Sequence, residues 1–180
     1  MKKSNFWSAR NMAVMALFAA LTAICAQITI PIGAVPVSLS LLPVLLCALL
    51  LNPSRAVTAM LVYMLLGLAG APVFSGFSGG PAKLFGVTGG YILGYIPCVL
   101  VIGLLLKKSR DSWILQILSM VLGVLVCYVF GTVWFMVLRH TGLVESLSLC
   151  VFPFLPFDAV KIYLAWLLAR YLRAPLRSIL

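Results

Sequence analysis

Long apolar stretches separated by short polar segments dominate the chain. A helix needs about 20 apolar residues to cross the hydrocarbon core of a bilayer. Six stretches approach that length, so the pattern predicts an all-α membrane protein, a single bundle of six transmembrane helices. The predicted spans cover residues 11–30, 37–51, 56–70, 89–106, 113–138 and 156–172. The second and third are short, and we expect them to lie nearly upright or to be shielded by their neighbours.

Lysine and arginine are distributed unevenly between the segments that join these spans. The side that holds both termini collects Lys2, Lys3, Arg10, Arg55, Lys107, Lys108, Arg110, Arg170, Arg173 and Arg177. The other side has Lys83 and Arg139, and Lys161 lies within the last span. Because cytoplasmic segments carry the excess of basic residues, both termini are predicted to face the cytoplasm of a multi-pass cell-membrane protein.

The composition agrees with a membrane protein and argues against a soluble domain, a nucleic-acid-binding protein and a metal-binding protein. Hydrophobic residues make up 64% of the chain and charged residues 9%, whereas a soluble domain has about 25% charged residues. The net charge of +10 would suggest nucleic acid in a soluble protein, but here the basic residues sit between spans, so no nucleic-acid partner is expected. The five scattered cysteines and the single histidine, His140, predict no metal site and no cofactor.

The last predicted span carries an acid and an amine near its start, Asp158 and Lys161. Pro156 suits the first turn of a helix, where the helix dipole favours the Asp158 carboxylate. Residues three apart share one helix face. The pair could be a cap with a lysine reaching to the outer surface, but charges within spans are costly and usually mark function. We therefore predict a binding site that faces the interior of the bundle.

The loop from Ala71 to Gly90 is rich in glycine and is predicted to lie on the outer side. Gly89 and Gly90 precede the fourth span and free the backbone to expose N–H groups. Several aromatic residues are close in sequence: Phe74, Phe77, Phe85 and Tyr91. Aromatic faces together with backbone donors indicate a small-ligand pocket.

The first predicted span has a smooth face of small residues, formed by Ala9, Ala13, Ala16, Ala19, Ala20 and Ala23. Such a face lets another helix approach closely. Two interpretations remain open for it: tight packing inside the bundle, or docking of another membrane subunit.

Four segments together resemble the BioY family, the biotin-specific substrate-capture (S) subunits of energy-coupling factor (ECF) transporters. They are PIGAVPVSL (31–39), GLAGAPVFSGFSGG (67–80), KLFGVTGGYILGY (83–95) and PFLPFDAVK (153–161). The resemblance covers nearly the whole chain. It implies a six-helix protein that binds biotin and assembles with a transmembrane coupling protein and two cytosolic ATPases. It also implies that Ala16, Ala20 and Ala23 dock on the coupling protein, and that the subunit topples in the bilayer to carry its ligand inward.

Biotin offers two ureido N–H donors, an apolar ring and a carboxylate tail. The candidate binding residues are Asp158, Lys161, Tyr91, Gly89, Gly90, Thr88, Phe85 and Phe74. Asp158 would accept from the ureido group, and Lys161 would pair with the carboxylate or hold Asp158 in place. Tyr91 and Phe85 would pack on the ring, while Thr88 and the backbone of Gly89 and Gly90 would donate hydrogen bonds.

Other functions remain as alternatives. The chain could be an S component for another small vitamin, or a stand-alone membrane carrier or channel with a polar stripe along its pore. A membrane enzyme would use Asp158, His140 or Lys161 as acid or base. Three acidic residues in all, and no nucleophile–base spacing, speak against an enzyme.

Overall fold

The computed structural model describes residues 7–30, 36–107, 110 and 112–179, with the backbone alone for residues 174–179. Several residues used above lie outside this described part: Lys2, Lys3, Lys108, residues 31–35 of the PIGAVPVSL segment, and the side chain of Arg177.

Helices make up most of the described chain, which confirms the predicted helical class. The longer ones are α1 (Ala9–Gln27), α2 (Leu41–Leu50), α3 (Pro53–Leu68), α6 (Tyr95–Leu105), α7 (Trp113–Arg139) and α9 (Leu155–Ile179). The shorter elements are β1 (Thr29–Ile30), β2 (Val37–Ser38), α4 (Pro81–Leu84), α5 (Gly89–Leu93) and α8 (Leu143–Cys150). The two strands pair antiparallel, with Thr29 opposite Ser38.

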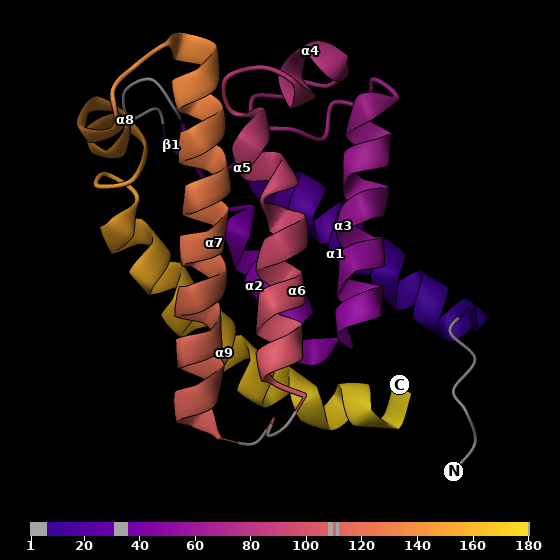
Figure 1. The fold of residues 1–180 in the computed structure, drawn as a ribbon. Helices are drawn as coiled ribbons and strands as arrows, with labels where there is room; N and C mark the ends of the chain where they lie inside the picture. The colour runs from indigo at the N-terminus through magenta and orange to yellow at the C-terminus, as the bar shows by residue number, and fades with distance from the viewer. Residues whose placement is uncertain (1–6, 31–35, 108–109, 111, 180) are drawn as a thin grey trace.

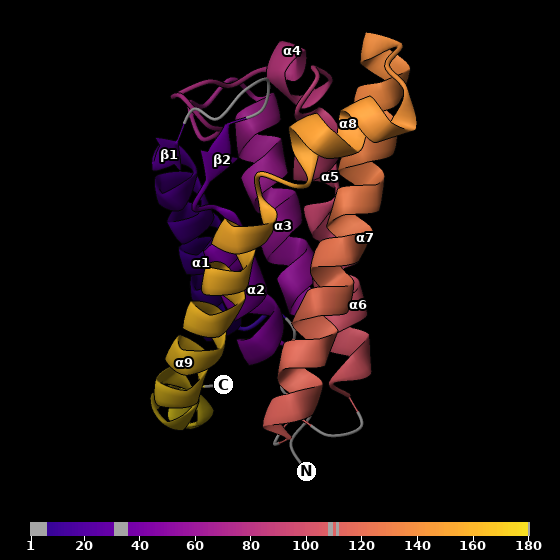
Figure 2. The same ribbon diagram turned by 90° about the vertical axis from the view of Figure 1, so that its left-hand side faces the viewer.

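The longer helices form a bundle with two distinct ends (Figure 1). One end, called the loop end, holds α4, α8 and both strands (Figure 2). The opposite end, called the basic end, holds the link between α6 and α7 and the last turns of α9. Helix α9 runs obliquely across the bundle and packs against both α2 and α7. It begins near mid-height of the bundle, below α8, and its first turns carry Asp158 and Lys161 (Figure 2).

Helix α2 lies in the middle of the bundle because nearly every residue in it is apolar. All of its residues except Leu42 are buried, and it packs against α1, α6 and α9. Its ten residues span about 15 Å at about 1.5 Å per residue. A helix this short and this apolar is stable where its neighbours surround it. The sequence predicted such shielding for the second span.

The outward faces of the bundle are apolar, as lipid requires. Leu17 and Ile24 of α1 are each 64% exposed, and Val129 of α7 is 62% exposed. Among the described residues, α1 and α7 are each long and apolar enough to cross a membrane. The pair α8 and α9, bent by 52°, would count as a third span if taken as one.

Several predicted spans have different limits in the structure. The span predicted at 37–51 begins with β2, because Ser38 joins the strand pair before α2 starts. The span predicted at 89–106 corresponds to one apolar helical stretch, Gly89–Leu105, in which α5 and α6 meet at Gly94. Helix α8 was not predicted, because its sequence, LVESLSLC, mixes serine and glutamate with the apolar residues.

Candidate functional site

A cavity of about 80 Å³ lies among the helices toward the loop end and is called the pocket here. Side chains from the first and second halves of the chain line it together. They are Ala26, Pro36, Ser38, Ser40, Leu41, Tyr63, Ser75, Thr88, Tyr91, Ile92, Tyr95, Val124, Cys127, Tyr128, Phe154, Asp158 and Lys161. The pocket is therefore an apolar and aromatic chamber with a few polar groups, the usual composition of a small-ligand site.

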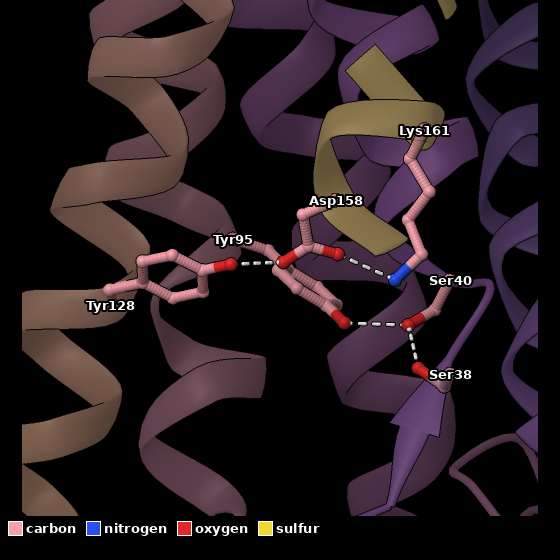
Figure 3. Close-up of polar contacts among 6 residues, drawn as sticks. All are labelled: Ser38, Ser40, Tyr95, Tyr128, Asp158 and Lys161. Atoms are coloured by element: carbon pink, nitrogen blue, oxygen red, sulfur yellow. Dashed lines mark hydrogen bonds and ion pairs between the residues drawn. The ribbon is translucent and has the colours of Figure 1, made fainter. Parts of the chain in front are cut away.

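Asp158 and Lys161 face the pocket from the first turns of α9. Lys161 Nζ donates to Asp158 Oδ1 over 2.6 Å, and the two residues are 6% and 4% exposed. Two charges removed from solvent are stable only as a pair with further hydrogen bonds. The alternative of a lysine reaching outward does not describe this structure, in which Lys161 points to its partner (Figure 3).

Tyr128 of α7 supplies the further hydrogen bond. Its hydroxyl donates to Asp158 Oδ2 over 2.5 Å, so each carboxylate oxygen accepts from a different group (Figure 3). This contact links the middle of α7 to the start of α9. Tyr128 thereby orients the carboxylate toward Lys161.

A second polar group lies beside the first. Ser40 Oγ is 2.6 Å from both Tyr95 Oη and Ser38 Oγ, so the three hydroxyls form a chain (Figure 3). Ser38 comes from β2 and Tyr95 from α6. All three line the pocket, and each hydroxyl can both donate and accept. The pocket thus offers charged groups and adaptable hydroxyls on neighbouring walls.

Tyr91 forms an aromatic wall of the pocket from α5. Its ring stacks on Phe154 with centroids 6.4 Å apart, and its hydroxyl donates to the Cys150 carbonyl over 3.3 Å. The ring can lie against α7 because residue 131 is glycine: a Cβ there would come within 2.2 Å of Tyr91 Cε1. Gly90 similarly allows close contact with Trp134 of α7.

The structure brings together some of the predicted site residues and not others. Asp158, Lys161, Tyr91 and Thr88 line the pocket. Gly89 and Gly90 are buried next to it at the start of α5, where the Gly89 N–H already donates to the Gly86 carbonyl.

The two predicted phenylalanines lie elsewhere. Phe74 is fully buried and packs edge-on against Tyr63, with centroids 5.5 Å apart, so it supports a pocket wall from behind. Phe85 is 55% exposed and does not line the cavity.

The sequence analysis did not single out Tyr128, Tyr95, Ser38 or Ser40. The two tyrosines are hydroxyl groups within otherwise apolar spans, a signal of the same kind as the charge pair. The two serines carried no such signal, because the predicted helix over 37–51 would have placed them differently.

The predicted docking alanines lie on the surface of α1. Ala16 and Ala20 are exposed and Ala23 is half-buried, whereas Ala19 faces the core and is 1% exposed. Helix α1 therefore has small side chains both on the face that packs in the bundle and on its exposed face.

Comparison with known proteins agrees with this architecture. The family described as "BioY family" matches residues 1–178. The "Probable biotin transporter BioY" of Pyrococcus horikoshii is 38% identical over 92% of this chain and 97% of its own length. The "Biotin transporter BioY" of Thermotoga maritima is 36% identical over 91% and 96%.

Solved structures agree as well. The crystal structure of the S-component for biotin from an ECF-type ABC transporter superposes with a TM-score of 0.87 at 28% identity, covering 95% of this chain and 94% of that one. Another S component of a bacterial ECF transporter, at 16% identity and a TM-score of 0.51, shares the fold alone. Since the family matches nearly every residue, the chain described here belongs to the BioY family.

Proposed function

We propose that this chain is the biotin-binding S component of an ECF-type transporter for biotin uptake. The observation that carries the proposal is the buried Asp158–Lys161 pair, which faces the pocket. A polar ligand with N–H donors and an anionic tail needs an acceptor and a cation in an otherwise apolar chamber. The names of the Pyrococcus horikoshii and Thermotoga maritima relatives support biotin as that ligand.

The pocket groups can be assigned to parts of the ligand. Asp158 accepts from the ureido N–H groups, since a carboxylate offers several lone pairs. Lys161 either pairs with the biotin carboxylate or holds Asp158 in place, and its hydrogen bond to Asp158 Oδ1 supports the second role. Tyr91 packs on the apolar rings, and Thr88 donates a hydrogen bond. Phe74 contributes through Tyr63.

Substitution of the charge pair tests this assignment. Removing one partner of a buried ion pair costs about 3–5 kcal/mol, and about 1.4 kcal/mol corresponds to tenfold in affinity. Asp158→Asn and Lys161→Ala should each weaken biotin binding by about two orders of magnitude or more, measured by calorimetric titration of the purified chain in detergent. Arg139→Gln changes an exposed residue at the last position of α7 that does not line the pocket. It removes one positive charge, as Lys161→Ala does, and should bind biotin normally.

Two results would contradict the proposal. Near-normal affinity in both pair variants, with unchanged thermal unfolding, would remove the pair from the site. Titration with other small vitamins on the same preparation decides the remaining alternative: tighter binding of one of them than of biotin would identify a different cargo.

The proposal includes the partners and the membrane arrangement. In this proposal the chain has six spans with both termini in the cytoplasm. It assembles with a transmembrane coupling protein in the bilayer and with two cytosolic ATPases. The exposed positions of Ala16 and Ala20 support α1 as the docking helix, because small residues allow close helix approach. Uptake by the purified chain alone in liposomes would instead favour a stand-alone carrier.

A further inference from the structure

Helices α7 and α9 border a second hollow at the basic end of the bundle, far along both helices from the pocket. This groove has a volume of about 570 Å³. Its lining consists of Trp113, Gln116, Trp166, Arg170 and Arg173. None of these residues lines the pocket, so the groove is a separate feature with its own chemistry.

Two tryptophans and two arginines give the groove its character. The Arg170 guanidinium lies over the Trp166 ring, 5.7 Å from the centroid, a position that holds the charged group in place. Trp113, at the first residue of α7, is 59% exposed. Tryptophan and arginine at the end of apolar helices belong to the level of lipid headgroups.

The inner side of the groove is fixed by hydrogen bonds. Arg173 Nη1 and Gln116 Nε2 both donate to the Arg110 carbonyl, over 2.7 and 2.6 Å. Arg110 in turn donates to the Leu51 carbonyl over 2.8 Å. These contacts connect α9, α7 and the ends of α2 and α6, so the groove is built on a connected framework.

Positive charge accumulates around this framework. Burial, and then the neighbouring Arg173 guanidinium, lower the pKa of Arg110 from its ordinary value. The acidic residues that the structure describes, Glu145 and Asp158, lie in α8 and in the first turn of α9. The third acidic residue, Asp111, lies outside the described residues.

We propose that this groove binds the phosphodiester headgroup of an anionic phospholipid. Arg170 and Arg173 contact the phosphate, because guanidinium groups match its oxygens in pairs. The acyl chains lie against exposed apolar surface beside the groove, which on α9 includes Tyr163, a residue 57% exposed whose ring centroid lies 6.1 Å from that of the groove-lining Trp166. Basic hollows between helices on the cytoplasmic side are a recurring site for anionic headgroups.

Lipid retention by the delipidated full chain tests the proposal. Native mass spectrometry in detergent compares phosphatidylglycerol with phosphatidylcholine carrying the same acyl chains, and inorganic phosphate is added in a third arm. The unaltered chain should bind phosphatidylglycerol at least about tenfold more tightly than phosphatidylcholine. Arg170→Gln should reduce that preference about tenfold, which is the size expected for loss of one charge-assisted contact. Arg170→Lys should retain part of it.

Arg139→Gln is the matched control, because it removes an exposed arginine at the opposite end of α7. An equal loss of the phosphatidylglycerol preference in Arg170→Gln and Arg139→Gln would show that only the net charge of the protein matters, and would overturn the proposal. Equal retention of the two lipids by the unaltered chain would also overturn it. Displacement of the lipid by millimolar inorganic phosphate would show a soluble anion site instead. Weakened assembly of Arg170→Gln with the purified coupling subunits, at unchanged lipid retention, would assign the groove to an acidic protein segment.

Discussion

Asp158, Lys161 and Tyr128 are buried together, and each supplies a contact that the others need. An isolated charge at this depth would cost several kcal/mol, whereas here both oxygens of Asp158 accept hydrogen bonds. Arginine at position 161 would not be equivalent, because its planar fork is larger and lacks the compact charge of an ammonium group. At the scale of single residues, the site is therefore stable because each buried polar group has a hydrogen-bond partner among the other two residues.

Gly131 offers a separate test of the pocket wall. In Gly131→Ala the new methyl group would meet the Tyr91 ring at 2.2 Å, so the ring must move away from α7. Overpacking of this kind costs about 1–3 kcal/mol. We expect a lower thermal unfolding temperature and weaker biotin binding by roughly tenfold, measured by a melting assay and by titration.

Gly142→Ala is the control for this prediction, since no atom outside its neighbours lies within 4 Å of the added Cβ. It should leave both quantities unchanged. Normal binding in Gly131→Ala would mean that the position of the Tyr91 ring does not matter for the ligand.

At the scale of elements, Gln27 ties the end of α1 to the loop before α4. Its amide Nε2 donates to the Ala23 carbonyl over 2.9 Å and to the Pro72 carbonyl over 3.4 Å, and its Oε1 accepts from the Phe77 N–H over 2.8 Å. Ser75 of the same loop lines the pocket.

Gln27→Ala should therefore loosen this loop. Loss of hydrogen bonds worth about 0.5–1.5 kcal/mol each predicts faster amide exchange in residues 70–80 and faster biotin release, by about threefold to tenfold per bond lost. Hydrogen exchange with mass spectrometry and a dissociation assay measure the two effects. Thr58→Ala removes a comparable side-chain bond, to the Ser54 carbonyl on α3, and should change neither rate.

The elements also show what sequence patterns could establish. Long apolar runs predicted α1 and α7 closely, because a bilayer demands length and apolarity that few other structures need. The charge pair stood out for the same reason, as an expensive exception in an apolar span. The close approach of Gly94 to Cys127 joins distant segments and could not be predicted from the apolar pattern. Ser40 lines the pocket and contacts Tyr95, which is 55 residues away in the sequence, so local patterns did not reveal it.

At the scale of the whole molecule, the basic residues assign the two ends to the two sides of the membrane. Arg55, Lys107, Arg110, Arg170 and Arg173 lie toward one end, and α8 with Glu145 lies at the other. The excess of basic residues predicts that the basic end faces the cytoplasm, which leaves the pocket near the outer surface.

Thiol labelling in intact cells tests this orientation. Glu145→Cys and Ser54→Cys each place a thiol at an exposed position, at the loop end and the basic end respectively. A membrane-impermeant maleimide should label the first in intact cells and the second only after the membrane is opened. The native cysteines are all buried, so the unaltered chain provides the background. The reverse labelling pattern would show that the basic end faces outward, and would contradict both the predicted orientation and the proposed direction of transport.

The balanced ion pair also has an electrical consequence. The Asp158–Lys161 ion pair carries no net charge, whereas ionised biotin would add one negative charge. Carrying one elementary charge through a membrane potential is worth about 2.3 kcal/mol per 100 mV. In the proposed transport cycle, delivery of ionised biotin to a negative cell interior is therefore electrically uphill, while return of the ion pair without biotin is electrically silent. The proposed ATPase partners would have to supply this extra work in the inward step alone.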